Sequence, residues 1–221
     1  MHDPRRSSRR PTAPVGRLTG AAGAARGARG RSRGFTLLEL LLALSITTIV
    51  LAMSVPMTAS ALDEIRTSMA ARYLEGRIMN ARMLAVKRSS SVALRFEPAA
   101  GDYGIAEYLD GNGNGIRSAE ITSGLDPQLA PRQFLRHQFP LVVFGLRGGI
   151  PDVDGARSTA DSDGIRIGSS RILSLGPDGT ATSGTLYLHG RRGQFAVRIL
   201  GATGRTRVLR FDTGTGQWSP R

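Results

Sequence analysis

One carboxylate interrupts a long apolar stretch of the chain. Residues 35–62 contain a single charged side chain, that of Glu39. A carboxylate in an apolar span costs about 3 kcal/mol unless it is paired or protonated, so an ion partner is expected. Proteolysis of the Gly34–Phe35 peptide bond would create an α-amino group four residues before Glu39. This amine and the carboxylate are natural ion partners, within one chain or between neighbouring chains of a bundle, and burial strengthens their preference for pairing.

A second group suited to binding chemistry lies near the C-terminus, where Arg205 and Arg207 follow Gly204. In a strand, residues two apart point to the same face. Two guanidinium groups on one exposed face can bind phosphates. Arg210 and the Arg191–Arg192 pair of the preceding turn would enlarge this basic patch. The alternative is a solvated or acid-paired strand face, and the sequence leaves both interpretations open.

The segment 110–115 alternates Asp or Asn with Gly and resembles the beginning of a calcium loop. Asp110, Asn112 and Asn114 would supply oxygen ligands, and Glu120 would add a second carboxylate. The EF-hand pattern requires Glu at its twelfth position, which is Ile121 here, so Glu120 comes one residue early. The favoured interpretation is therefore a Gly/Asn-rich loop, with calcium binding as the alternative.

The residues needed for common catalytic sites are not arranged in any familiar pattern. The chain has no cysteine, which excludes disulfides, zinc–thiolate sites and cysteine nucleophiles. Its three histidines, at positions 2, 137 and 189, are too scattered for a metal motif, and the sequence contains no Walker loop, nucleophile elbow or His-Glu-x-x-His. We predict a non-enzyme without a cofactor; a periplasmic enzyme on a signal anchor is the competing hypothesis.

The apolar stretch and the charge around it predict a membrane topology. Residues 35–62 exceed the roughly 20 apolar residues that span a bilayer. Residues 1–34 contain nine arginines and one aspartate, so they account for +8 of the formal net charge of +13 and leave +5 for residues 35–221. An arginine-rich flank stays cytoplasmic, which places residues 63–221 outside. Residues 1–34 are interpreted as a leader without a packed core. A signal peptide cut near Ala59–Ala61 and a simple signal anchor are the alternatives.

Beyond the apolar stretch the sequence predicts an amphipathic helix and then strands. Residues 62–88 repeat apolar side chains at three- and four-residue steps, namely Leu62, Ile65, Met69, Tyr73, Met79, Met83 and Val86. The arginines of the other faces are expected to be solvated: Arg66, Arg72, Arg77, Arg82 and Arg88. From residue 91 the period changes toward two, and Gly, Asp, Asn and Pro separate eight strand candidates: 92–96, 103–108, 141–146, 164–167, 171–175, 185–188, 195–200 and 205–211. The fold class predicted is α+β, an antiparallel β-sheet head packed on the helix.

The segment Gly34-Phe35-Thr36-Leu37-Leu38-Glu39, between a basic flank and an apolar helix, resembles the cleavage signal of type IV pilins and pseudopilins. The resemblance implies that prepilin peptidase cuts after Gly34 and methylates the amine of Phe35. It also implies that Glu39 helps to register the subunit in a helical filament.

Three later segments, 175–180, 184–186 and 204–207, resemble the C-terminal half of the GspH/FimT family of pseudopilins, whereas residues 109–162 resemble a variable insertion. In the FimT branch of that family, a Gly-Arg-x-Arg motif at this position is associated with DNA binding during natural transformation. The resemblance carries this role over to Arg205 and Arg207 only.

The domain organisation expected is a basic leader over 1–34, a transmembrane and filament-core helix over 35–62, its amphipathic continuation over 63–90 and a β-rich head over 91–221. The leading hypothesis is a minor pseudopilin, a structural subunit of a type II secretion system. The alternative is a minor type IV pilin that binds DNA. The partners expected are other pilins or pseudopilins, prepilin peptidase and the bacterial inner membrane, which the chain would cross once with its N-terminus cytoplasmic and its head periplasmic; DNA is the partner for the alternative.

Overall fold

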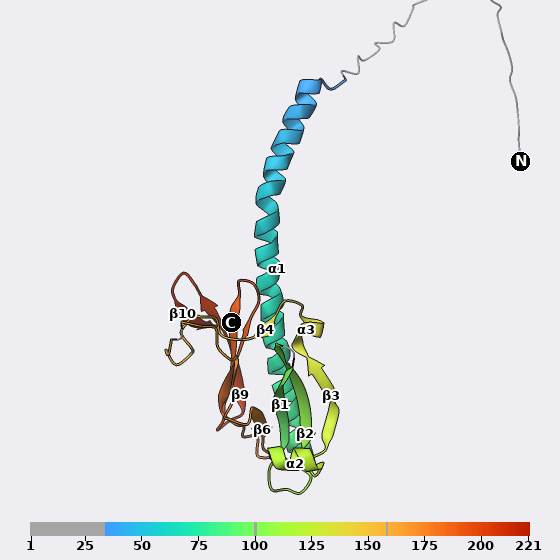
Figure 1. Cartoon of the computed structure of the whole chain (residues 1–221), viewed down its shortest axis with the longest axis vertical. Coiled ribbons are helices and arrows are strands. Elements are labelled where there is room, and N and C mark those ends of the chain that lie inside the picture. The colour runs from blue at the N-terminus through green and yellow to red at the C-terminus, as the bar shows by residue number, and fades with distance from the viewer. Residues whose placement is uncertain (1–33, 100, 158) are drawn as a thin grey trace, which may run out of the picture. The chain divides into compact units, whose positions relative to one another are not determined.

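The computed structural model describes residues 34–99, 101–157 and 159–221 (Figure 1). The leader predicted over residues 1–34 lies outside the described residues, apart from Gly34. The chain divides into two units between Ser45 and Ile46. The first described unit consists mainly of the beginning of helix α1, and the second contains the rest of α1 and every strand.

Helix α1 spans Leu37–Arg88 and includes Pro56. It begins after Thr36, whose Oγ1 accepts a hydrogen bond from the backbone N–H of Glu39 at 3.2 Å. A Thr-x-x-Glu sequence is typical of a helix N-terminus, because the hydroxyl satisfies an amide that has no partner within the helix. Lys87 and Arg88 lie in the last turn, where positive charge complements the helix dipole. The helix is long and apolar enough to cross a membrane.

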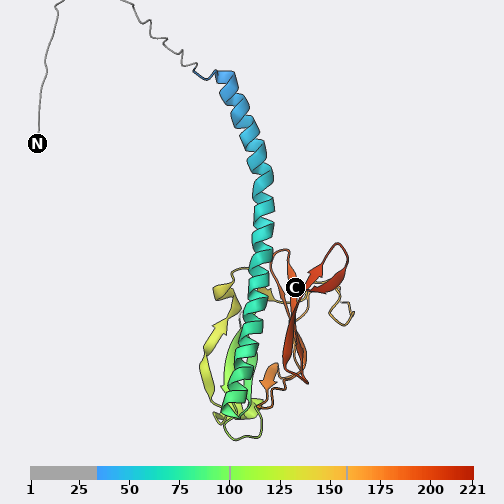
Figure 2. The same ribbon diagram turned by 180° about the vertical axis from the view of Figure 1, so that it is seen from behind.

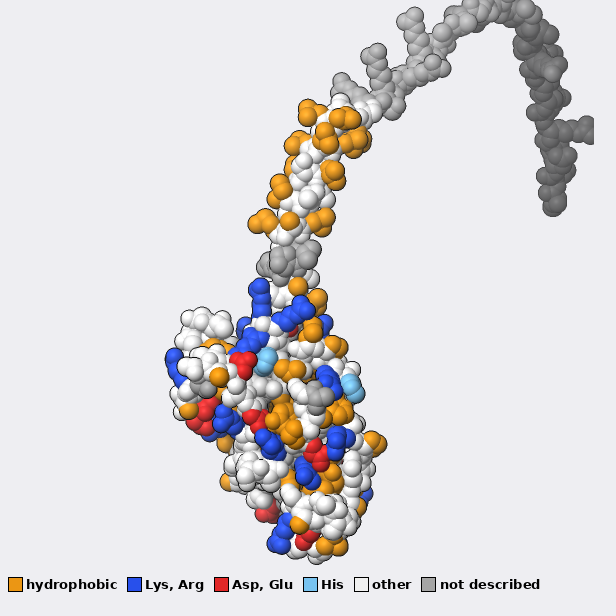
Figure 3. All heavy atoms as spheres, viewed as in Figure 1, with side chains coloured by type: hydrophobic (Ala, Val, Ile, Leu, Met, Phe, Trp, Pro, Cys, Tyr) orange, Lys and Arg blue, Asp and Glu red, His pale blue; other side chains and the backbone are white. Residues whose placement is uncertain are grey.

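Apolar side chains cover the face of the first part of α1 that is seen in Figure 3, and consecutive apolar positions along the sequence place them on its other faces as well. The leucines from Leu37 to Leu44 and the branched residues Ile46, Ile49 and Val50 are all more than half exposed within the chain. A helix that is apolar all round requires an apolar environment, such as a bilayer or a bundle of similar helices.

The head contains two antiparallel sheets. The first has the strand order β3-β2-β1-β6 and the second the order β10-β9-β8-β7-β4, with β5 also paired to β7. The strands of the first sheet are β1 (Val92–Ala99), β2 (Asp102–Leu109), β3 (Gln128–Phe134) and β6 (Ile172–Leu175). Those of the second are β4 (Val143–Phe144), β5 (Ile165–Arg166), β7 (Gly184–His189), β8 (Gln194–Leu200), β9 (Arg205–Asp212) and β10 (Gln217–Pro220). Two short helices, α2 (Ser118–Ser123) and α3 (Leu135–Gln138), complete the head.

The α+β fold class is confirmed, and each of the eight predicted strand segments overlaps an observed strand. Strands β3 and β10 were not predicted. β3 contains Pro131 and largely exposed residues, so its sequence lacks the alternation that marks a half-buried strand. It lies at the edge of its sheet, where proline is tolerated.

In Figures 1 and 2, β3 of the first sheet and β9 of the second lie to opposite sides of α1. One face of α1 packs on both sheets. We call this the head face; its buried residues are Asp63, Thr67, Ala70, Ala71, Leu74, Ile78, Ala81 and Ala85. They share one core with alternate residues of the strands, among them Leu94, Phe96, Leu186 and Val197. Alanine permits a close approach of helix and strands, because the separation between packed elements depends on the side chains at the contact.

The apolar stripe predicted from the sequence lies elsewhere. Its residues Leu62, Ile65, Met69, Met79, Met83 and Val86 are exposed, and we call them the outer face of α1. Only Tyr73 of that stripe packs against the core. The expectation that all five helix arginines are solvated is also wrong for two of them. Arg77 forms an ion pair with Glu107 at 3.5 Å, and the Nε of Arg82 donates to the carbonyl oxygen of Gly179 at 2.9 Å.

Asp63 fastens the helix to the turn between β7 and β8. Its carboxylate accepts backbone N–H groups of Arg191 and Arg192 at 2.8 Å each and of Gly193 at 3.3 Å. Burial by itself raises the pKa of Asp63, but the three N–H donors and the positive charge of Arg147 hold this pKa below its usual value. The ionised carboxylate is therefore the form that fits the head.

Candidate functional site

The residues of the predicted cleavage signal lie at the beginning of α1. Gly34 and Phe35 precede the helix, and Glu39 lies in its first turn. The backbone N–H of Glu39 is bound by Thr36, as described above, whereas its carboxylate has no hydrogen bond or ion pair among the described residues. The side chain of Glu39 is therefore available to a cation of another molecule or to an α-amino group created by cleavage.

Arg205 and Arg207 lie at the beginning of β9, and both are exposed. They share a face with Leu209, which packs with Tyr187 and Trp218 on the side of the second sheet away from α1. Neither arginine has an ion pair within the described part of the chain. Their exposure agrees with the predicted basic face.

The backbone conformation and close packing at position 204 explain why a glycine precedes the two arginines. Its φ angle is +59°, and a Cβ atom built on it would lie 2.4 Å from the carbonyl oxygen of Gly179 and 2.9 Å from the Cδ of Arg82. Only glycine adopts this conformation in so little space without strain. The turn before β9 is thus held against α1, and Arg205 and Arg207 follow it on the opposite face of the strand.

The other arginines considered from the sequence do not extend this patch. Arg210 points toward α1 and pairs with Glu64 at 3.0 Å. Arg191 and Arg192 lie in the turn at the Gln194 end of β8, whereas Arg205 pairs with Leu200 at its other end. A seven-residue strand separates these ends by about 20 Å. The sequence could not place these side chains, because it does not show which strand ends adjoin.

Two further arginines, which sequence reasoning missed, lie in register with Arg207. Arg166 of β5 is opposite Thr185 of β7, Thr185 is opposite Arg198 of β8, and Arg198 is opposite Arg207 of β9. Directly opposed residues of antiparallel strands point to the same face. Arg166, Arg198 and Arg207 therefore form one row across the sheet, which we call the arginine row. The signal that could have located Arg198 is its place between the buried residues Val197 and Ile199, which predicts an outward side chain.

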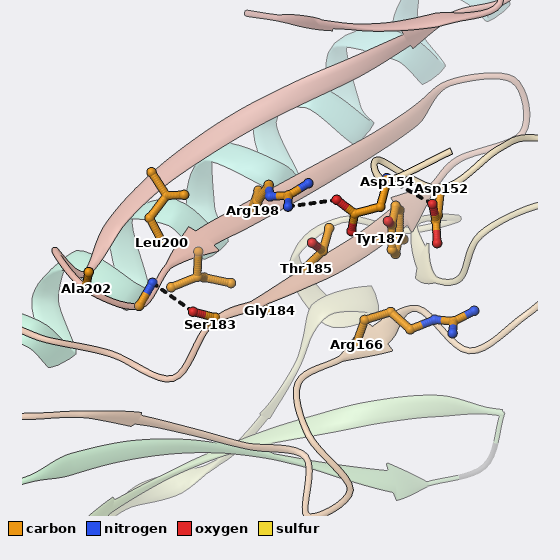
Figure 4. A pocket seen from close by; sticks show the side chains of 12 residues that line it. Asp152, Asp154, Arg166, Ser183, Gly184, Thr185, Tyr187, Arg198, Leu200 and Ala202 are labelled. Atoms are coloured by element: carbon orange, nitrogen blue, oxygen red, sulfur yellow. Dashed lines mark hydrogen bonds and ion pairs between the residues drawn. The ribbon is translucent and has the colours of Figure 1, made fainter. Parts of the chain in front are cut away.

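A depression of about 530 Å³ lies over part of this row (Figure 4). Its lining includes Arg166, Thr185, Arg198, Ser183 and Tyr187, together with Asp152 and Asp154 from the loop of residues 151–157. Figure 4 shows Arg198 directed at Asp154, and the atoms Nη2 of Arg198 and Oδ1 of Asp154 are 2.8 Å apart. The site thus combines two guanidinium groups and several hydroxyls with two carboxylates, of which Asp154 pairs with Arg198.

The predicted calcium loop follows β2, and backbone N–H groups of the loop donate hydrogen bonds to the carboxylate of Asp110. Oδ1 of Asp110 accepts the N–H groups of Asn112 at 3.2 Å and Gly113 at 2.7 Å, and Oδ2 accepts that of Gly115 at 2.8 Å. The amide of Asn114 donates to Glu120 at 2.8 Å. In the part of the chain that the structure describes, no cluster of three or more His, Asp or Glu side chains is placed to hold a metal ion. Calcium binding stays the untested alternative to the favoured metal-free loop, and a calcium titration followed by thermal unfolding tests it.

The two histidines of the head take part in packing and turns. The ring of His137 lies 5.2 Å from that of Phe134, and Nδ1 of His189 lies 3.0 Å from the carbonyl oxygen of Gly190.

Comparison with known protein families finds a match at the beginning of the chain. Residues 29–55 match the prokaryotic N-terminal methylation motif. No curated protein matches the chain, and no solved structure matches it either. The motif includes Gly34, Phe35 and Glu39, and it coincides with the apolar beginning of α1. The motif, the membrane-length helix and the α+β head support a type IV pilin-like, membrane-anchored protein that assembles with other pilins after processing by prepilin peptidase.

Proposed function

We propose that this protein is a minor pseudopilin, a structural subunit of the periplasmic filament of a type II secretion system. The observation that carries the proposal is the methylation motif over residues 29–55, together with the carboxylate of Glu39, which has no ion pair among residues 34–99, 101–157 and 159–221. In the proposed mechanism prepilin peptidase cuts after Gly34 and methylates Phe35. Glu39 then pairs with the α-amino group of a neighbouring subunit as the apolar helices bundle in the inner membrane.

The outer face of α1 supports assembly through this helix. It presents six exposed apolar side chains on the part of the helix that also packs on the head. A neighbouring helix would remove this apolar surface from water. The head would then lie on the periplasmic side, which the positive leader of residues 1–34 favours.

The proposal is tested by deleting the gene and complementing it with the wild-type chain, Glu39→Ala or Glu39→Asp. We expect wild type to restore protein secretion and Glu39→Ala to fail, with Glu39→Asp partly active because it keeps the charge. Intact-mass analysis of the purified chain should show a methylated N-terminus at Phe35. Normal filament incorporation of Glu39→Ala would contradict the role given to this residue.

The second candidate is a minor type IV pilin that binds DNA during natural transformation. It is favoured by one observation, the exposed and unpaired state of Arg205 and Arg207 on a single face of β9. The same deletion strain separates the two functions: loss of secretion supports the pseudopilin, and loss of DNA uptake with normal secretion supports the DNA-binding pilin. For the latter, Arg205→Ala/Arg207→Ala should abolish uptake, whereas Arg191→Ala, which removes an exposed arginine at the far end of β8, should not.

A further inference from the structure

The arginine row is not uniformly available to a ligand. Arg166 and Arg207 are exposed and have no ion pair among the described residues. Arg198, between them, is paired with Asp154 and only 35% exposed. Since neighbouring strands are about 4.8 Å apart, Arg198 lies roughly 5 Å from Arg207 and 10 Å from Arg166 along the row. The centre of the basic face is thus neutralised by one carboxylate.

The loop that carries this carboxylate is built as a separate, anchored turn. Oδ1 of Asp152 accepts the N–H groups of Asp154 at 2.9 Å and Ala156 at 2.8 Å, so Asp152 shapes the turn. The N–H of Val153 donates to the Tyr187 hydroxyl at 3.0 Å, and the Trp218 indole donates to the carbonyl oxygen of Pro151 at 2.9 Å. The backbone is therefore held on the sheet without any contribution from the Asp154 side chain.

Asp154 itself is 67% exposed, and its side chain makes no contact that the loop requires. An exposed ion pair contributes little to stability. Another anion can therefore replace the Asp154 carboxylate at Arg198 at little cost. A backbone phosphate has the geometry for this exchange, because guanidinium groups bind phosphate and carboxylate oxygens in the same fork-like manner.

We propose that Arg166, Arg198 and Arg207 form a phosphate-binding row for DNA lying across β5, β7, β8 and β9, and that Asp154 is a built-in competitor for the phosphate at Arg198. The proposal rests on the second candidate function, DNA binding, and adds two binding residues and a control element to it. In the free protein Asp154 lowers the charge of the row. When DNA binds, the phosphate takes the place of the carboxylate on Arg198, and the side chain of Asp154 turns to solvent.

The test compares DNA binding by the full-length chain in neutral detergent micelles, as wild type and as Asp154→Asn, across a salt series. The control is Glu64→Gln, which likewise removes a carboxylate that pairs with arginine, but on the face toward α1: Glu64 pairs with Arg210 and with Arg221, each at 3.0 Å. Duplex DNA of fixed length is the probe. Each phosphate neutralised contributes about −0.9 to the slope of log affinity against log salt concentration.

We expect Asp154→Asn to bind more tightly than wild type by up to about fivefold, the factor that corresponds to one exposed ion pair. The salt slope should be unchanged, because Arg198 neutralises the same phosphate in both chains. Adding Arg198→Ala to Asp154→Asn should cancel the gain and make the slope shallower by about 0.9, and Glu64→Gln should leave the affinity at the wild-type value. Asn keeps the shape of Asp, and circular dichroism of each variant confirms that the head remains folded.

The outcomes separate this inference from the function on which it rests. If wild type binds DNA through Arg205 and Arg207 but Asp154→Asn behaves as Glu64→Gln does, DNA binding stands and the role of Asp154 is overturned. If only Asp154→Asn binds, the exchange at Arg198 is overturned, because the proposal requires a phosphate to displace Asp154 in the wild-type chain. If neither binds at low salt, both the DNA-binding function and the arginine row are rejected, and the secretion pseudopilin remains.

Discussion

The head face and the outer face of α1 occupy the same helical turns but differ in the size of their side chains and in burial. The head face is buried with small residues, mostly alanine, around Leu74 and Ile78. The outer face carries larger apolar side chains, such as Ile65 and Met83, and leaves them exposed. If hydrophobicity alone decided burial, the two faces would be exchanged. The difference indicates that burial against the sheets is decided by how closely the backbones approach, whereas the larger side chains of the outer face stay exposed within the chain.

The largest effect is expected from Leu74→Ala on the head face. Leu74 is only 1% exposed and lies in the core shared by both sheets. Its truncation should lower the free energy of unfolding by about 2–5 kcal/mol, because the cavity cannot close against strands on one side and a helix on the other. Denaturant unfolding of the full-length chain in detergent measures this. A loss below about 0.5 kcal/mol would mean that the head face does not pack as described.

A smaller loss is expected from Asp63→Ala, which removes the polar contact of the head face. The N–H groups of Arg191, Arg192 and Gly193 lose their common acceptor. Leaving buried donors unsatisfied costs about 1–3 kcal/mol. The matched variant Ile65→Ala, on the outer face two residues away, should change the unfolding free energy by less than about 0.5 kcal/mol. Equal effects of the two variants would remove the distinction between the faces.

Acid should weaken the head face selectively, because the outer face has no carboxylate among its six residues. The N–H donors hold the pKa of Asp63 below its usual value of 3.8 against the opposing effect of burial. Burial also raises the pKa of Asp163, but hydrogen bonds from the N–H of Ile165, the Tyr103 hydroxyl and Arg171 hold this pKa below its usual value. The stability contributed by such carboxylates is fully present above pH 3.8 and is lost as the pH falls through the folded-state pKa. We therefore expect unfolding free energy to fall below about pH 4, and to fall less steeply in Asp63→Asn.

The smallest effect on stability is expected from Met69→Ala/Met83→Ala on the outer face. This double variant should instead weaken assembly. Both side chains are exposed, so each change should alter the unfolding free energy of the free subunit by less than about 0.5 kcal/mol. If the outer face packs against other subunits, the double variant should be recovered in smaller amounts in cross-linked filaments. Recovery equal to that of wild type would mean that this face has another use.

Much of the molecule could be predicted because it depends on residues close together in the chain. The position of Glu39 after Gly34 and Phe35 indicates the processing signal, and a match to the methylation motif covers these residues. The period of two located β7, β8 and β9 to within one residue or two. The calcium-like loop was correctly placed as a loop after β2, but its ligand set could not be judged, since the partners of Asp110 are backbone groups whose direction depends on the turn.

The remaining features depend on contacts between distant parts of the chain. Asp63 and Arg191 are far apart in sequence, and only the packing of α1 on the second sheet brings them within 2.8 Å. The arginine row likewise exists only because the register of four strands aligns Arg166, Arg198 and Arg207. The sequence by itself determined the membrane helix, its cleavage signal and the α+β class, because these follow from local composition and period. The tertiary structure alone decided which face of α1 is buried, which arginines share a surface and which carboxylate neutralises one of them, because these follow from close approach and strand register.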